Sequence, residues 1–233
     1  MDWPIEPGQI WQCADQRLIC ADMRSVGPDV IGHYDTLVFD PPWDDPLFCT
    51  NLPAKSKLVM AGSAWLQRAI EIHGAPTWLF VWDLRGRLFV KDRPLAAAKY
   101  CLWYGELDSY RQSAVLMGAA QSAQAITTQS SAHASGNAGG KWLSDIYTCT
   151  IKEARKDNPH PHCKPLDWMT ALLGNCTSGT VFDPCAGGGT TLLAAQMLRR
   201  RATGVEISPE HCNLILRRMH ALTGVTPIMT GTI

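Results

Sequence analysis

The C-terminal part of the chain alternates between strand-like and helix-like segments, and this pattern restricts the fold more than any other feature. Residues 180–183 (TVFD) and 202–207 (ATGVEI) are typical of buried strands, whereas residues 190–200 (TTLLAAQMLRR) and 208–222 (SPEHCNLILRRMHAL) are typical of helices. Strands and helices in alternation predict a parallel sheet with helices on both faces. The 233 residues, 46% of them hydrophobic, suffice for one α/β domain with a substantial core.

The second of these helices carries clear boundary signals. Ser208 is suited to cap its N-terminus, Pro209 fits the first turn, and Glu210 would lie beside the positive end of the helix dipole. The dipeptide Thr223-Gly224 marks its end.

Three apolar runs earlier in the chain predict further buried strands. They are residues 36–40 (TLVFD), 77–83 (TWLFVWD) and 98–107 (AKYCLWYGEL), each bounded by proline, glycine or charge. Residues 119–140 are small and polar and lack aromatic side chains, which predicts a mobile surface loop.

Charge and cysteine content exclude several classes of protein. The formal net charge is zero, so there is no general attraction to nucleic acid, although the middle of the chain is basic. The start, MDWPIEPGQIWQ, has neither a basic nor an apolar signal region, and no long apolar window follows, so we expect a cytoplasmic protein. Nine cysteines without framework spacing predict reduced, packed thiols, and without a C-x-x-C pair we expect no metal site.

The turn DPCAGGGTT, residues 183–191, lies between a predicted strand and a predicted helix, where open α/β sheets bind ligands. It lacks the lysine of a phosphate-binding P-loop, and Leu192 replaces the third glycine of a dinucleotide fingerprint. A nucleoside ligand without a pyrophosphate remains as the best candidate. Asp183 could pair with an ammonium group of that ligand, and Glu206 could accept both ribose hydroxyls.

Together with DPPW at residues 40–43, the glycine turn makes the chain resemble the DNA amino-methyltransferases that use S-adenosylmethionine. The order of the motifs, with DPPW before the cofactor turn, is that of the circularly permuted β group of this family. The segment HPHCKPLDWMTALL (160–173) is similar to the H-P-x-x-K-P segment of the family and the helix after it, and QRLICADMRSV (16–26) is similar to its opening strand. The resemblance implies a Rossmann-like methyltransferase fold with permuted motif order.

The resemblance also implies roles for individual residues. The catalytic motif comprises Asp40, Pro41, Pro42 and Trp43. The S-adenosylmethionine site is expected to comprise Asp22, Asp40, His160, Lys164, Asp183, Pro184, Cys185, Ala186, Gly187, Gly189, Thr190, Thr191, Glu206 and Ile207. We expect residues 1–233 to form a single methyltransferase domain, with an insertion at about 105–157 for target recognition and DNA contact.

The DPPW motif suits an exocyclic amine, which is a poor nucleophile because its lone pair is delocalised into the base. The Asp40 carboxylate and the Pro41 carbonyl can accept both amino hydrogens and so direct the lone pair at the methyl group. The prolines restrict the backbone that carries these acceptors. Trp43 offers a flat surface for a base that has left the duplex stack.

The expected substrate is duplex DNA with a flipped target base. The basic residues that we expect to contact the DNA phosphates are Arg85, Arg87, Arg111, Lys141, Arg155 and Lys156. Family members often dimerise, so a homodimer is also expected.

An aspartate at position 40 resembles the adenine-N6 enzymes more than the cytosine-N4 ones, in which S-P-P is commoner. The resemblance therefore implies a site-specific DNA adenine-N6 methyltransferase, of the kind found in restriction-modification systems. A DNA cytosine-N4 methyltransferase, an RNA adenine-N6 methyltransferase and a catalytically silent nucleic-acid-binding member of the fold stay open as alternatives. A methyltransferase for a small molecule or a protein is disfavoured by the basic middle segment and by the aromatic residue of DPPW.

Overall fold

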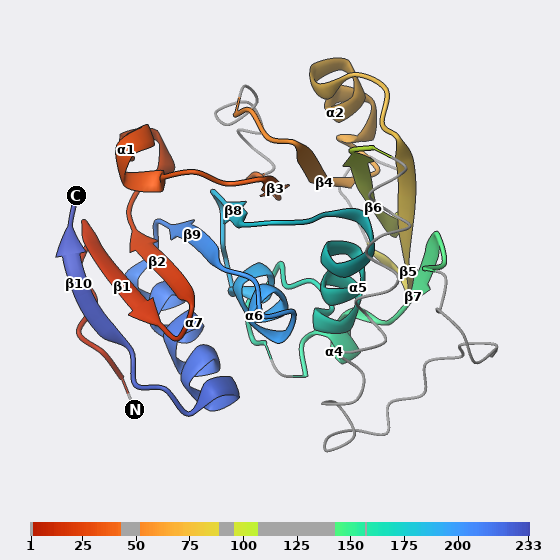
Figure 1. Cartoon of the computed structure of the whole chain (residues 1–233). Coiled ribbons are helices and arrows are strands. Elements are labelled where there is room, and N and C mark those ends of the chain that lie inside the picture. Colours follow the sequence, from red (N-terminus) through yellow and green to blue (C-terminus); the bar gives the residue numbers. More distant parts are fainter. Residues whose placement is uncertain (1, 43–51, 89–95, 107–142, 157) are drawn as a thin grey trace.

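The computed structural model describes residues 2–42, 52–88, 96–106, 143–156 and 158–233 (Figure 1). The strands are β1 (Gln9–Cys13), β2 (Gln16–Cys20), β3 (Thr36–Phe39), β4 (Ser56–Gly62), β5 (Trp78–Leu88), β6 (Ala96–Tyr104), β7 (Ile146–Thr148), β8 (Val181–Asp183), β9 (Ala202–Glu206) and β10 (Ile228–Thr232). The helices are the 3₁₀-helix η1 (Met23–Ser25), α1 (Pro28–Ile31), α2 (Leu66–His73), α4 (Ile151–Ala154), α5 (Leu166–Cys176), α6 (Thr190–Met197) and α7 (Pro209–Thr223). None of these helices is both long and apolar enough to cross a membrane.

The strands form one mixed sheet in the order β10-β1-β2-β9-β8-β3-β4-β6-β5-β7. The five central strands, from β2 to β4, are parallel to one another. Antiparallel pairs flank them, β1 with β2 and β10 on one side and β6 with β4 and β5 on the other. The predicted α/β class with a mostly parallel sheet is confirmed, while the antiparallel margins were not predicted.

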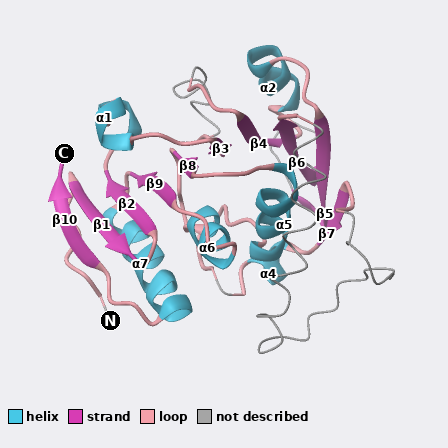
Figure 2. Cartoon of the chain, in the orientation of Figure 1, coloured by secondary structure: helices cyan, strands magenta, loops and turns pink. Residues whose placement is uncertain are grey.

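Helices cover both faces of this sheet, as predicted (Figure 2). Side chains of β3 alternate between two apolar clusters: Leu37 and Phe39 belong to one, and Val38 belongs to the other. The larger cluster includes buried residues of α5, α6 and α7, and the smaller includes those of η1 and α1. Figure 1 shows α1 and α2 along the upper side of the sheet and α5, α6 and α7 along the lower side. Because parallel strands in such a sheet are covered on both faces, their central residues are apolar, as in β3 with Leu37, Val38 and Phe39.

The C-terminal elements follow the sequence signals closely. The Ser208 hydroxyl accepts a hydrogen bond from the His211 amide, Pro209 opens α7, and Gly224 ends it with a φ of 70°. The helix predicted over 190–200 is shorter than expected, because α6 ends at Met197 and Arg199 has a φ of 54°. A residue in the left-handed region cannot continue a right-handed helix.

The predicted thiols are packed in the interior. Of the eight cysteines in the described ranges, all are free, seven are buried and Cys185 is half-buried.

Candidate active site

The carboxyl ends of the central strands surround a cavity of about 790 Å³. Its walls come from the ends of β2, β3, β8 and β9, from the glycine turn and from residues 160–164. The strand order places β8 between β9 and β3, so the connections from β8 and β3 lead away in opposite directions at this point. Such a reversal in strand order is where open α/β sheets bind their ligands.

Almost all described members of the predicted site line this one cavity. They are Asp22, Asp40, Pro41, Pro42, His160, Lys164, Asp183, Pro184, Cys185, Ala186, Gly187, Thr190, Thr191, Glu206 and Ile207. Gly189 is not among the described lining residues; its φ is 76°, and a Cβ there would come within 2.8 Å of Ile215 Cγ1 on α7. Trp43 lies outside the described residues. The tertiary structure therefore brings the DPP segment and the glycine turn together from distant parts of the chain.

The glycine turn is shaped by close packing against Asn158. A Cβ on Gly188 would lie 2.4 Å from Asn158 Oδ1, so no larger residue fits without displacing that side chain. Asn158 is 2% exposed; its Nδ2 donates to Thr190 Oγ1 at 3.2 Å, and its Oδ1 accepts from the His160 amide at 3.2 Å. Asn158 thus joins the turn to residues 160–164. Its role was not predicted from the sequence, although only Pro159 separates it from the HPHCKP segment.

Glu206 lies at the end of β9 with only 8% of its surface exposed. One carboxylate oxygen accepts the Gly187 amide at 2.7 Å, and the other accepts the Ser208 amide at 2.9 Å. The two amides hold the carboxylate in one orientation at the cavity wall. Each oxygen keeps a further lone pair, so Glu206 can still accept hydrogen bonds from two hydroxyls of a ligand.

Asp183 ends β8 and is 3% exposed. Its Oδ1 accepts the Cys185 amide at 3.0 Å, and the Thr191 hydroxyl also donates to the carboxylate. Burial nevertheless raises the pKa of Asp183 to about 7. A cationic partner strongly stabilises the charged form of such a buried carboxylate, because it replaces the hydration that burial removes.

Asp40 follows β3 and faces the same cavity. Its Oδ2 accepts a hydrogen bond from the Lys164 ammonium group, and Lys164 is 7% exposed. The same ammonium group donates to the His162 carbonyl at 3.2 Å. Lys164 was assigned to the cofactor from the resemblance; the structure shows it in contact with the first residue of the DPPW motif.

Histidines form one side of the cavity. The His160 and His211 rings lie edge to face with centroids 4.5 Å apart, and His211 was not predicted. Burial, together with the positive groups of His211, His162 and Lys164, lowers the pKa of His160 to about 4. His160 is therefore neutral near pH 7, so it can form a hydrogen bond to a ligand in the cavity without adding charge there.

Asp22 follows β2 and lines the cavity. Its carboxylate caps η1 by accepting the Arg24 amide at 2.9 Å. Hydrogen bonds from Arg24 hold the pKa of Asp22 below its usual value. Asp22 is thus ionised at neutral pH and lies within reach of a ligand in the cavity.

The predicted phosphate-binding residues are distributed more widely. Arg85 is exposed on β5, Arg87 belongs to the same strand, and Arg155 and Lys156 are exposed just after α4. The Arg155 guanidinium donates to the Pro161 carbonyl at 2.5 Å, which links it to the loop beside the cavity. Arg111, Lys141 and the loop predicted over 119–140 lie outside the described residues. Within the described ranges, no group of three or more His, Cys, Asp or Glu side chains is arranged to hold a metal ion.

Comparisons with known proteins agree on one type of protein. A relative from Moraxella bovis, the Type II methyltransferase M2.MboI, is 31% identical over 91 residues, which is 37% of this chain. The matched segment spans only 33% of the length of that relative.

Solved structures resemble most of the chain. The PvuII DNA methyltransferase (cytosine-N4-specific) superposes with a TM-score of 0.62 at 14% identity, covering 94% of each chain. The M1.HpyAVI–SAM complex has a TM-score of 0.57 at 16% identity, covering 87% of this chain and 99% of the other. At such low identity the likeness establishes the fold.

A family model described as DNA methylase, covering N6 and N4 enzymes, matches residues 77–217. The matched range includes the glycine turn and the HPHCKP segment, and it begins after DPPW. Because this range exceeds half of the chain, the protein belongs to the N6/N4 DNA methylase family.

Proposed function

We propose that this protein is a DNA adenine-N6 methyltransferase that uses S-adenosylmethionine. The observation that carries the proposal is a single cavity in which the Asp40-Pro41-Pro42 segment faces Asp183 and Glu206. An acceptor for the target amine and the acids of a nucleoside site are thereby placed together, as transfer between two bound reactants requires. A Type II methyltransferase among the relatives supports a restriction-modification setting.

The residues of the cavity fit this cofactor. A volume of about 790 Å³ is sufficient for a nucleoside with an amino-acid chain. Asp183 would receive the ammonium group, and Glu206, already oriented by two backbone amides, would receive the ribose hydroxyls. Asp22 would face the adenine ring, as the resemblance implies. M1.HpyAVI, which shares the fold, was crystallised as a complex with SAM.

When bound, the cofactor supplies an electrophilic methyl group on sulfur. Asp40 would accept one hydrogen of the target amine and the Pro41 carbonyl would accept the other, which makes the nitrogen lone pair available for attack. Both acceptors border the cavity, so the amine would arrive directly beside the cofactor site. We propose Trp43 as the stacking surface for the flipped base.

Adenine is favoured over cytosine by the aspartate at position 40. A second candidate, DNA cytosine-N4 methylation, is supported by the likeness to the PvuII enzyme, which is cytosine-N4-specific. The two candidates share the cavity and the cofactor, and they differ only in the base that is presented to Asp40.

The test is transfer of a labelled methyl group from S-adenosylmethionine to duplex DNA, followed by digestion to nucleosides and chromatography. We expect label in N6-methyladenine, complete loss of transfer in Asp40→Ala, and wild-type transfer in Asp15→Ala, which removes an exposed carboxylate from the β1–β2 turn. Label in N4-methylcytosine alone would establish the second candidate. Transfer to RNA but not to DNA, or binding without any transfer, would reject the proposal.

A further inference from the structure

We propose that Lys164 is a positioning residue for methyl transfer, which holds one oxygen of Asp40 so that the carboxylate stays directed at the target amine. This inference rests on the proposed function. It assigns Lys164 to the DPPW motif rather than to the cofactor.

The contacts of the two side chains support this role. Lys164 Nζ donates to Asp40 Oδ2 and to the His162 carbonyl, at 3.2 Å from the latter, so two acceptors restrict the ammonium group. Lys164 is 7% exposed and Asp40 is 24% exposed, so the carboxylate remains accessible while its partner is buried. Among the described residues, no donor to Asp40 Oδ1 is found, which leaves this oxygen for a substrate hydrogen.

The backbone of Lys164 is itself held in place. It directly precedes Pro165, which caps α5, and its carbonyl accepts from the Thr190 hydroxyl at 3.5 Å. The partner, Asp40, lies 124 positions away and is held by the end of β3. The ion pair therefore connects the end of β3 to the segment just before α5, and the Thr190 contact joins that segment to the start of α6.

The positive charge of Lys164 also offsets the repulsion between Asp40 and the other acids of the cavity. Asp40 shares the cavity with the carboxylates of Asp183 and Glu206, which would repel it if no cation were near. Lys99 is a second cation that acts on Asp40, but it lies over the Trp82 ring at 5.3 Å, and no hydrogen bond joins it to Asp40 among the described contacts. Lys164 is thus the cation that can set the orientation of the carboxylate.

The same strand provides a matched control. Asp35 immediately precedes β3 and pairs with Lys55, whose Nζ lies 2.6 Å from Asp35 Oδ1. This second Lys–Asp pair lies at the opposite end of β3 and does not line the cavity. Lys55→Met therefore removes an ion pair of the same type from the same strand without touching the site.

The first measurement separates methyl transfer from cofactor binding. In single-turnover assays at saturating cofactor and duplex, we expect Lys164→Met to lower the rate by up to about 100-fold, since a displaced acceptor spoils the attack geometry. The dissociation constant for S-adenosylmethionine, measured by calorimetry, should stay within about threefold of wild type. Lys55→Met should match wild type in both. A cofactor constant that rises while the saturated rate is unchanged would make Lys164 a cofactor ligand and overturn the inference.

The second measurement is a double-mutant cycle that combines Lys164→Met with Asp40→Ser. Serine is chosen because it occupies this position in the related S-P-P motif. If Lys164 acts through the Asp40 carboxylate, adding Lys164→Met to Asp40→Ser should change the residual rate by less than about threefold. A full loss on top of Asp40→Ser would show that Lys164 acts independently, which also overturns the inference.

Thermal unfolding of each variant guards against a folding defect. If Lys164→Met does not fold, Lys164→Arg replaces it; its guanidinium keeps the charge but not the geometry, so we expect an intermediate rate with unchanged cofactor affinity. A wild-type rate in a folded Lys164→Arg together with a wild-type rate in Lys164→Gln would reject positioning by Lys164. If the wild-type protein transfers no methyl group at all, the proposed function fails and this inference fails with it; if wild type is active and Lys164→Met is too, the inference alone fails.

Discussion

Two acids of the cavity lie one strand apart yet have different surroundings. Glu206 is held by two backbone amides, whereas Asp183 is almost fully buried and burial raises its pKa to about 7. The cost of ionising Asp183 in the empty site would be offset by a cationic ligand group. If Asp183 receives the ammonium group of the cofactor, as proposed, cofactor binding should depend on pH.

We predict that S-adenosylmethionine binds more weakly as the pH falls from 8 to 6. Asp183 is protonated below its pKa of about 7 and then loses its charge-assisted contact with the ammonium group. Calorimetry across this range should show a steady loss of affinity in wild type and a weak, nearly constant affinity in Asp183→Asn. Equal pH dependence in the two proteins would mean that another group controls binding.

The raised pKa of Asp183 also affects the stability of the ligand-free protein. The folded state binds a proton at Asp183 that the unfolded state has already lost between about pH 4 and pH 7. Stability therefore decreases as the pH rises through this window, in contrast to the usual behaviour of a paired carboxylate. Asp183→Asn should remove this contribution in urea unfolding measured at pH 5 and pH 8.

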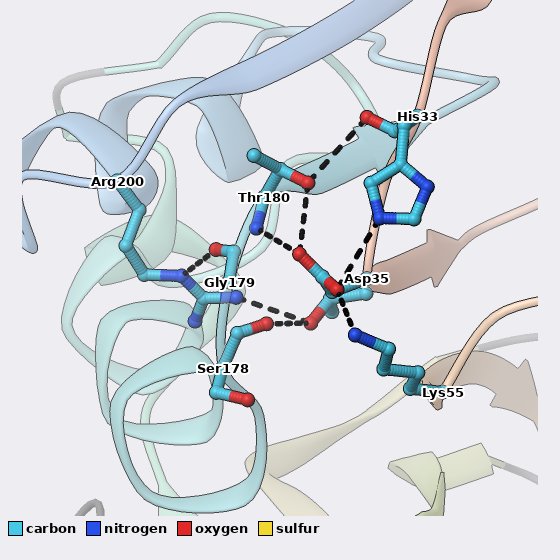
Figure 3. A network of polar contacts seen from close by, with 8 residues as sticks. His33, Asp35, Lys55, Ser178, Gly179, Thr180 and Arg200 are labelled. Atoms are coloured by element: carbon cyan, nitrogen blue, oxygen red, sulfur yellow. Dashed lines mark hydrogen bonds and ion pairs between the residues drawn. The ribbon is translucent and has the colours of Figure 1, made fainter.

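At the scale of secondary structure, the amino ends of β3 and β8 are joined by a polar network remote from the cavity (Figure 3). Asp35 accepts from Lys55 and from the Thr180 amide and hydroxyl, and these partners hold the pKa of Asp35 well below its usual range. Arg200 donates to the Gly179 carbonyl at 2.7 Å and to the Thr36 hydroxyl at 3.1 Å. This network lies at the amino ends of the two strands whose carboxyl ends carry Asp40 and Asp183.

Arg200 also completes the end of α5. Its guanidinium donates to the Leu173 carbonyl at 2.8 Å and to the Thr177 hydroxyl at 2.9 Å, so the Leu173 carbonyl gains a donor besides the Thr177 hydroxyl. Burial lowers the pKa of Arg200 to about 10, which still leaves it charged near neutral pH.

We predict that Arg200→Met lowers the free energy of unfolding by about 1 to 3 kcal/mol, because it removes the donor to the buried hydroxyls of Thr36 and Thr177. The neighbouring Arg201 is exposed, so Arg201→Met is a control with the same chemical change and should stay within about 0.5 kcal/mol of wild type. Urea denaturation followed by circular dichroism measures both. Similar losses in the two variants would show that the network adds nothing specific.

At the scale of the whole molecule, two exposed basic side chains lie next to the cavity in sequence. Arg155 and Lys156 follow α4 and lead into the loop whose residues line the cavity. A duplex that presents a flipped base to Asp40 would pass close to this loop. The positions of Arg155 and Lys156 thus support a DNA backbone that runs beside residues 155–164, next to the cavity.

We predict that the combined variant with Arg111, Lys141, Arg155 and Lys156 changed to Ala binds duplex DNA with a shallower salt dependence. Each lost phosphate contact should reduce the slope of log K against log salt by about 0.9, so four contacts give up to about 4. Fluorescence anisotropy over a salt series measures the slope, and cofactor affinity should be preserved. A control that changes four other cations to Ala (Lys55, Arg199, Arg201 and Arg217) should keep the wild-type slope. Equal slopes in the two variants would place the DNA elsewhere.

The sequence by itself determined the parts of the protein that depend on local signals. The strand, glycine turn and helix around Asp183 and the cap of α7 at Ser208 could be predicted. These features depend on neighbouring residues, because backbone propensities and helix caps act over a few positions. The adenine preference, the homodimer and the roles of the individual site residues stay predictions.

Only the tertiary structure decided the contacts between distant segments. The Lys164 contact with Asp40 spans 124 positions, and the Arg200 contact with Thr36 spans 164. Asn158 against Gly188, and the antiparallel margins formed by β1 with β10 and by β5 with β6, were likewise not apparent beforehand. Such contacts depend on the order in which strands join the sheet, and so does burial, which raises the pKa of Asp183. No local pattern encodes that order, because it results from the packing of the whole chain.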